Sequence, residues 1–189
     1  LSPDLIIANK EENGKEQIER LGDHSDVWIP AVNNLDEAIK MIHDIGELTQ
    51  RQHQASALSR KIREGFDHLI KVSSQKRKLK TAYLIWKDPL MVAGGRTFIN
   101  DMLKYAGLEN VFASLDRYPE ISLNTLKEKN IDLILLPSEP YPFKLKHKPE
   151  IAKLNPGVKI ELVDGEMFSW YGSRLLKSVD YFLSFLNNK

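Results

Sequence analysis

Aromatic side chains are concentrated in segments that follow strand-like stretches of this sequence. They are Trp86, Tyr118, Tyr141, Phe143, Phe168, Trp170 and Tyr171. Because aromatic rings stack on other flat rings, such a group suits a flat or macrocyclic ligand. The alternative is that these rings close the ends of a sheet as part of its core, and any single ring considered alone fits that reading somewhat better. For Trp86, Tyr118 and Trp170 taken together, we expect a cleft.

Other chemistries have weaker support in the sequence. The absence of Cys excludes disulfides, Cys-ligated metals and thiol catalysis. No metal-ligand spacing occurs among the five histidines, which are His24, His43, His53, His68 and His147. Ser138 and Ser169 lack a plausible His/Asp partner for nucleophilic catalysis. No G-x-G-x-x-G or Walker pattern indicates a nucleotide. We therefore expect no resident metal, no cofactor and no catalytic residue.

The composition is that of an ordinary globular protein. The 189 residues are 42% hydrophobic and 28% charged, which allows one large domain or two small ones. The formal net charge of +1 gives no reason to expect nucleic acid as a partner. No run of about 18 apolar residues is present that would indicate a membrane span.

The elements that must position the aromatic residues are arranged around a helical region that starts at Asn34. Asn34 is a typical N-cap, and Glu37 stands where a capping box requires an acidic residue. Apolar residues at helical spacing predict a first helix to about Thr49 and a continuous second helix from Gln50 to Val72. At about 1.5 Å per residue the second helix is roughly 34 Å long, enough to cross a small domain. We interpret residues 50–76 as a backbone helix connecting the remainder of an N-terminal lobe, 1–49, to a C-terminal lobe, 77–189.

Strands alternate with helices elsewhere, which predicts an α/β fold with parallel sheets. The expected strands are 5–8, 27–32, 81–86, 110–113, 131–136 and 158–163, and the expected helices are 15–21, 97–105, 122–129, 148–154 and 171–186.

An internal repeat supports two similar lobes. Residues 2–8 resemble residues 130–136, and each segment is followed by a polar loop, a short helix, a strand and a long helix. A complete strand–helix–strand–helix unit precedes the second copy, whereas only Leu1 precedes the first copy's segment. We therefore expect that the N-terminal part of the first lobe, roughly 50 residues by comparison of the copies, is missing. A version extended at its N-terminus should accordingly be more stable.

Five motifs in order suggest a known family. They are residues 3–8 (PDLIIA), 86–95 (WKDPLMVAGG), 107–112 (GLENVF), 118–122 (YPEIS) and 132–136 (DLILL). Together with the helix between them, they resemble the periplasmic substrate-binding proteins of ABC importers for cobalamin, haem and iron–siderophore complexes. This resemblance covers essentially the whole chain and implies two α/β lobes joined by one long, rigid helix.

The resemblance also implies roles for particular residues. The family binds its ligand in the cleft against aromatic residues, and the candidate ligand-binding set here is Trp86, Tyr118, Trp170, Phe168, Asn9, Tyr141 and Arg174. Asn9 stands where the cobalamin-binding member has a tryptophan. Arg174 fits either a ligand carboxylate or a pairing with Asp164 or Glu166. One carboxylate per lobe docks to the permease in this family, and the candidates are Glu12 or Glu16 in the first lobe and Glu120 in the second.

The leading hypothesis is thus a periplasmic or lipid-anchored extracytoplasmic binding protein. It would deliver a chelated metal or corrinoid to an ABC permease and catalyse no reaction. Stacking suits an iron–siderophore, haem and cobalamin alike. The alternative is a cytoplasmic α/β enzyme with its active site in the inter-lobe cleft, against which the missing catalytic and cofactor motifs count.

Overall fold

The computed structural model describes residues 2–9, 13–154 and 156–187, which divide into two compact units. The first unit ends at Val32 and the second begins at Asn33. This division falls earlier in the chain than the predicted boundary after residue 49, because the two helices that follow Asn33 pack with elements of the second unit.

The first unit is a strand–helix–strand motif. It consists of β1 (Leu5–Ile7), α1 (Lys15–Gly22) and β2 (Asp26–Trp28), and β1 and β2 pair in parallel. Within the described residues of this unit, Ala8 is the one buried hydrophobic side chain, and α1 buries none. The expected strand 27–32 is limited to its first residues, and Pro30 follows shortly after β2 ends.

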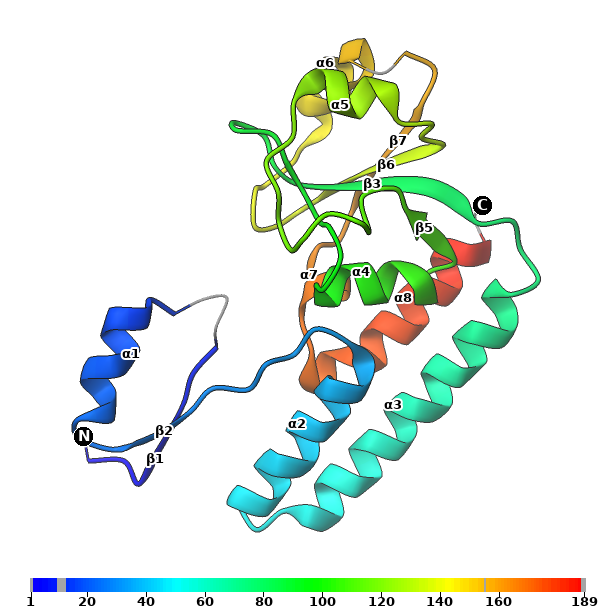
Figure 1. Cartoon of the computed structure of the whole chain (residues 1–189). Helices are drawn as coiled ribbons and strands as arrows, with labels where there is room; N and C mark the ends of the chain where they lie inside the picture. Colours follow the sequence, from blue (N-terminus) through cyan, green and yellow to red (C-terminus); the bar gives the residue numbers. More distant parts are fainter. Residues whose placement is uncertain (1, 10–12, 155, 188–189) are drawn as a thin grey trace. The chain divides into compact units, whose positions relative to one another are not determined.

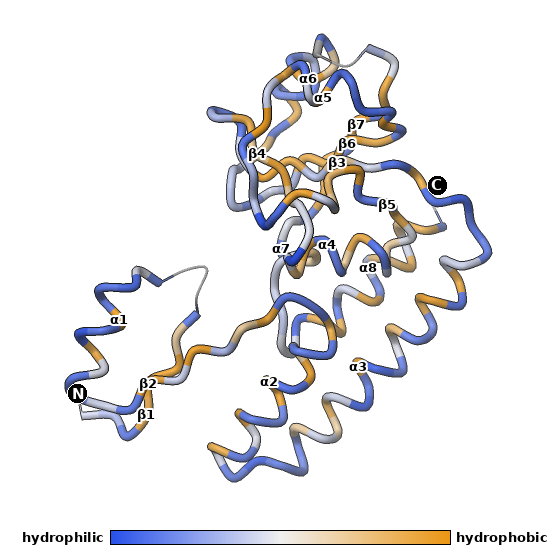
Figure 2. Tube along the Cα trace, in the orientation of Figure 1, coloured by the Kyte–Doolittle hydropathy of each residue, from blue (hydrophilic) through white to orange (hydrophobic). Residues whose placement is uncertain are grey.

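Three long helices form one layer of the second unit: α2 (Leu35–Leu48), α3 (Gln52–Ser73) and α8 (Leu175–Asn187). The helix α3 packs against both α2 and α8 (Figure 1). Hydrophobic and hydrophilic residues alternate along α2 and α3 as expected for amphipathic helices (Figure 2). Gly46 lets these two helices approach closely, because a Cβ atom there would lie 2.4 Å from the Cβ atom of Ala55. The prediction of one continuous helix is confirmed, whereas its role as a link between two full lobes stays a prediction.

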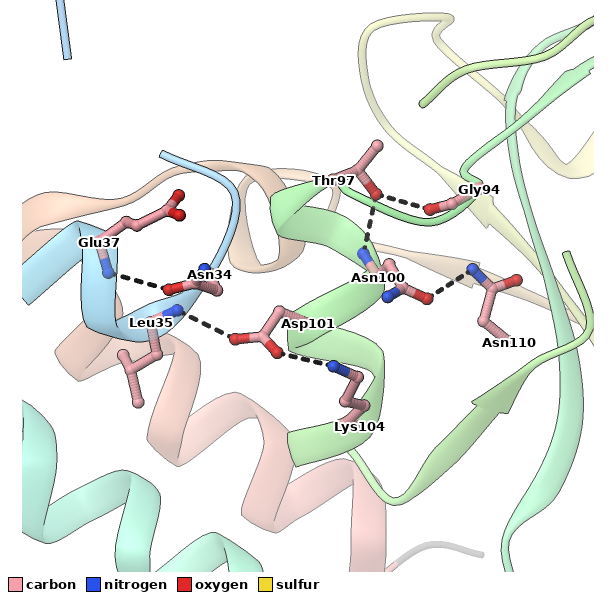
Figure 3. A network of polar contacts seen from close by, with 9 residues as sticks. All are labelled: Asn34, Leu35, Glu37, Gly94, Thr97, Asn100, Asp101, Lys104 and Asn110. Carbon is pink, nitrogen blue, oxygen red and sulfur yellow. Dashed lines mark hydrogen bonds and ion pairs between the residues drawn. The ribbon is translucent and has the colours of Figure 1, made fainter. Parts of the chain in front are cut away.

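The start of α2 is held by caps from two places in the sequence (Figure 3). Asn34 Oδ1 accepts a hydrogen bond from the Glu37 N–H at 2.9 Å, as the sequence predicted. The Leu35 N–H donates to Asp101 Oδ2 on α4 (Phe98–Tyr105) at 2.9 Å, so a distant carboxylate satisfies a second free amide of the first turn. Glu37 departs from the reciprocal capping box, because its Oε2 accepts from the N–H of Asn33, at 2.6 Å, and not from that of Asn34.

The sheet of the second unit has five strands: β3 (Leu79–Trp86), β4 (Met91–Val92), β5 (Leu108–Asn110), β6 (Leu133–Pro137) and β7 (Lys159–Val163). The strand order is β4-β3-β6-β7, with β5 also paired to β3. All these pairings are parallel except that of β3 with β4. The predicted α/β fold with parallel sheets is thus confirmed, and β4 is an antiparallel addition that the sequence did not indicate.

Shorter helices complete the second unit and cover both faces of its sheet (Figure 1). They are α4 (Phe98–Tyr105), α5 (Leu123–Glu128), α6 (Lys148–Leu154) and α7 (Glu166–Ser169), with 3₁₀ turns at Leu145–His147 and Gly172–Arg174. On the α5–α6 side, Leu84 and Ile134 share a hydrophobic cluster with Leu126 and Ile151. On the other side, the ring of Tyr83 packs on Phe168 of α7, with ring centroids 5.3 Å apart. The sheet is therefore buried on both faces, as its continuous apolar strands require.

Glycines account for two of the element boundaries that differ from those expected. The strand expected at 110–113 is β5 at Leu108–Asn110, directly after Gly107, whose φ of +67° ends α4 with a left-handed turn. The last helix starts at Leu175 instead of Tyr171, because Gly172, at φ +84°, opens a separate 3₁₀ turn.

Candidate functional site

The carboxyl ends of β3, β6 and β7 lie at one edge of the sheet, since these three strands are adjacent and parallel. Trp86 is the last residue of β3, Pro137 the last of β6 and Val163 the last of β7. In open parallel sheets this edge is where ligands bind. The segments that follow the three strands carry most of the predicted aromatic residues.

Trp86 and Tyr141 form the first aromatic pair at this edge. Their ring centroids are 5.5 Å apart in an edge-to-face arrangement, and Trp86 is 39% exposed. The Trp86 indole N–H donates to the Asp88 carbonyl oxygen at 3.1 Å, within its own loop. Tyr141 also packs on the buried ring of Phe143, with centroids 4.6 Å apart. The exposed Trp86 ring thus packs on Tyr141, which in turn packs on the buried ring of Phe143.

Trp170 is the second exposed ring and is held by charged groups. Its indole N–H donates to Glu139 Oε1 at 2.6 Å. The Ser169 hydroxyl lies 2.8 Å from the same oxygen and 2.9 Å from the Gly165 carbonyl oxygen, and shares its one proton between them. The Arg174 guanidinium carbon lies 5.2 Å from the Trp170 ring centroid. Arg174 also pairs with Glu166 at 2.8 Å, which is one of the two roles the sequence left open. Trp170 nevertheless keeps 48% of its surface exposed.

The loop after β6 and the loop after β7 are fastened together beside Trp170. The Gly165 N–H donates to Ser138 Oγ at 3.0 Å. A Cβ atom at position 165 would lie 2.7 Å from Glu139 Cγ and 2.9 Å from the Glu139 carbonyl oxygen. Only glycine therefore allows this approach, which fixes the backbone of Glu139 against the start of α7.

Tyr83 lies in the core close to Glu139. Its side chain is fully buried, and its hydroxyl is one of three buried side-chain atoms without a hydrogen-bond partner in the described part of the chain. Burial, followed by the charge of Glu139, raises the pKa of Tyr83 well above its usual value. The phenol therefore stays neutral at physiological pH.

Backbone pairing brings the Tyr118 segment to the same region. Trp86 is paired with Met91 across β3 and β4, and Met91 forms a bridge with Glu120. Tyr118 is half-buried two residues before Glu120, and the Arg117 guanidinium lies 5.7 Å from its ring centroid. Tyr118 thus lies on a segment neighbouring the end of β3.

Not all predicted site residues lie at this edge. Phe168 has no exposed surface and packs on Tyr83 and Phe182, with centroids 5.3 and 4.8 Å away. Its assignment as a ligand contact is therefore corrected to a core position, because the short helix α7 turns this ring towards α8.

The candidates from the first lobe belong to the first unit. The Asn9 N–H donates to Asn13 Oδ1 at 2.7 Å, and Glu16 is exposed in the first turn of α1. Glu12 lies outside the described residues. In the second unit, Glu120 is exposed.

Sequence reasoning missed Glu139, the carboxylate that joins the two loops. A charged residue two positions after a fully buried strand and directly before a proline was a signal that could have drawn attention to it. Its partner Trp170 is 31 residues away in the chain, so spacing alone did not connect them.

Comparison with known proteins identifies the family. Residues 1–159 match the periplasmic binding protein family, and the chain therefore belongs to it. A curated relative is the vitamin B12-binding protein of Vibrio parahaemolyticus serotype O3:K6 (strain RIMD 2210633), 22% identical over 125 residues. That match covers 65% of this chain but 46% of the relative, so it spans about half of the relative's length.

Solved structures share the fold at low sequence identity. An ABC transporter substrate-binding protein from Listeria monocytogenes EGD-e superposes with a TM-score of 0.83 at 19% identity, covering 99% of this chain and 78% of that one. The haem-binding protein BhuT in complex with two haems gives 0.80 at 18% identity, with 98% and 75% covered. The vitamin B12-binding protein BtuF of Vibrio cholerae gives 0.79 at 16% identity, with 98% and 74% covered.

Two features are absent from the described residues. None of their helices combines the length and hydropathy needed to cross a bilayer. Nor do they contain a group of three or more His, Asp or Glu side chains placed to hold a metal ion.

Proposed function

We propose that this protein is an extracytoplasmic solute-binding protein that delivers a chelated metal or corrinoid to an ABC import permease. The observation that carries the proposal is the pair of exposed indole rings, Trp86 and Trp170, at the carboxyl edge of a parallel sheet. Membership of the periplasmic binding protein family supports a binding role and an extracytoplasmic location.

The side chains at this edge suit binding of a large ring system. Trp86, Tyr141 and Trp170 offer aromatic surface, and burying it against a flat ligand is favourable because stacking adds about 0.5–1.5 kcal/mol per pair beyond area burial. Two charged groups lie next to Trp170, and both have partners within the protein. Glu139 accepts from the Trp170 indole N–H, and Arg174 pairs with Glu166. Both groups therefore suit a role in holding the aromatic rings in place. Relatives named for vitamin B12, haem and Fe3+-hydroxamate all carry ligands of this size class.

Docking to the permease completes the proposed function. Glu120 is exposed and forms a β-bridge with Met91, which pairs with Trp86 at the end of β3. Glu16 is exposed on α1. We assign the contacts with the permease to these carboxylates, with Glu12 as the alternative in the first lobe. A protein free in the periplasm and a lipid-anchored protein both fit this proposal, since both lie outside the cytoplasm.

Absorption spectroscopy with haem, a ferric hydroxamate siderophore and cobalamin tests the ligand class. We expect one of the three to give a saturable spectral change with the unsubstituted protein. Trp86→Ala, Tyr118→Ala and Trp170→Ala should each weaken that binding by about 1–3 kcal/mol, where 1.4 kcal/mol is a factor of ten.

The control is Ile70→Ala, which removes an equally exposed hydrophobic side chain from α3. It should leave the affinity unchanged. Thermal melting of every variant separates binding from folding. Unchanged affinity in all three aromatic variants, with a lowered melting temperature each time, would show that these rings are core and that the proposal is wrong.

A further inference from the structure

We propose that Glu139 is a positioning residue, which holds the Trp170 ring in the orientation that receives the ligand. This inference rests on the proposed function and adds a residue to its site. Glu139 Oε1 accepts a hydrogen bond from the Trp170 indole N–H at 2.6 Å. The Ser169 hydroxyl shares its one proton between the same oxygen, at 2.8 Å, and the Gly165 carbonyl oxygen, at 2.9 Å. Hydrogen bonds to an ionised carboxylate are roughly twice as strong as neutral ones, so this oxygen is an effective anchor.

The anchor is itself fixed. The close approach of Gly165 to Glu139 and the Gly165 N–H bond to Ser138 Oγ hold the backbone of the β6 loop against α7. A side chain attached to that backbone has little freedom to follow a moving indole. The position of Trp170 is consequently set by a loop that lies 31 residues earlier in the chain.

One face of the Trp170 ring is occupied by Arg174, whose guanidinium carbon lies 5.2 Å from the ring centroid. The edge of the ring that carries the N–H group is tied to Glu139. Trp170 keeps 48% of its surface exposed, and we assign the stacked ligand to the ring face opposite Arg174. A ring that binds through a single face gains affinity from being held in place. The entropy cost of ordering the ring then falls on folding and not on ligand binding.

Trp86 provides an internal comparison. Its indole N–H donates to the Asp88 carbonyl oxygen in its own loop, and not to Glu139. Removing the Glu139 carboxylate should therefore loosen one of the two exposed tryptophans and leave the other in place.

The test starts with time-resolved fluorescence anisotropy in the absence of ligand. Trp28→Phe and Trp86→Phe in the full 189-residue chain leave Trp170 as its one tryptophan, since the sequence contains three. Glu139→Ala should add a fast, nanosecond depolarisation of Trp170. Glu139→Gln should not, because an amide oxygen still accepts from the indole N–H. Glu109→Ala, which removes an exposed carboxylate on β5, is the control for charge and should match the parent.

The second measurement is a titration with haem, a ferric hydroxamate and cobalamin in the chain with all tryptophans. For the probe that binds, Glu139→Ala should weaken affinity about tenfold, and Trp170→Ala combined with Glu139→Ala should be no weaker than Trp170→Ala alone. An indole as immobile in Glu139→Ala as in the parent, or additive losses in the double variant, would overturn the inference. Absence of binding of every probe to the unsubstituted protein refutes the proposed function instead, and the ligand-free anisotropy still decides whether Glu139 holds the ring.

Discussion

Two strand–helix–strand motifs of this chain share a plan but differ in how deeply they are buried. In β1–α1–β2 the parallel register places Leu5 opposite Asp26, and in β6–α6–β7 it places Leu133 opposite Lys159. Leu5 and Leu133 are corresponding positions of the repeat seen in the sequence. All five residues of β6 are buried, whereas β1 is half-buried to exposed. An apolar run thus specifies a strand, but its stability depends on what covers it.

The two strands differ in burial because different numbers of strands and helices surround them. The strand β6 has β3 on one side and β7 on the other, with helices over both faces of the sheet. In the first unit, the described sheet has two strands, and Ile7, Leu21 and Ile29 are exposed. A two-stranded sheet is marginally stable in water. We therefore expect the two motifs to respond very differently to the same perturbations.

Hydrogen exchange should show the largest difference. The amides of β6 should exchange through global unfolding, whereas those of β1 should exchange through local opening at little free-energy cost. The expected contrast in protection is about a thousandfold or more, measured by native-state exchange with mass spectrometry. Equal protection of β1 and β6 would break the comparison, since it would mean that the first motif is as well supported as the second.

Large-to-small substitutions at corresponding strand positions give the next largest effect. Leu135→Ala in β6 removes a side chain with no exposed surface and should lower the free energy of unfolding by about 2–5 kcal/mol. Ile7→Ala in β1 removes a side chain that is 48% exposed and should cost about 1 kcal/mol or less. Urea denaturation followed by circular dichroism measures both, and similar costs would contradict the burial difference.

Helix caps extend the comparison from the two motifs to the two units, at the smallest scale. Ser122 caps α5 by accepting from the Thr125 N–H at 3.0 Å, and Ser122→Ala should cost about 0.5–2 kcal/mol. Gly14 begins α1 without a side-chain cap and has an extended backbone that serine adopts readily. Gly14→Ser should therefore protect the first amides of α1 by a few tenths of a kcal/mol, about the difference between glycine and serine caps. If exchange of those amides is unchanged or faster, the α1 terminus is not limited by its cap.

Local signals in the sequence were enough for much of the fold. The Asn34 cap, the apolar period of α3 and the repeated strands predicted elements that the structure contains. These features depend on residues close together in the chain, which is what periodicity and capping rules describe. Membership of the periplasmic binding protein family agrees with the resemblance drawn from five short motifs.

The parts that were missed depend on distant contacts. The strand β4 is two residues long and exists because β3 pairs with it. Phe168 and Trp170 are two residues apart, yet α7 turns the first into the core and leaves the second exposed. Glu139 acquires its role from Trp170 across two loops. None of these outcomes follows from spacing, because each is decided by packing between segments.

The cap that Asp101 provides to α2 couples the completion of this helix to α4. The Leu35 amide and the Asp101 carboxylate are 66 residues apart, so the second cap of α2 depends on an element distant in the chain. Until α4 has formed, Asn34 is the cap available to the first turn. The first turn of α2 is therefore completed in step with α4, wherever in the cell the chain folds.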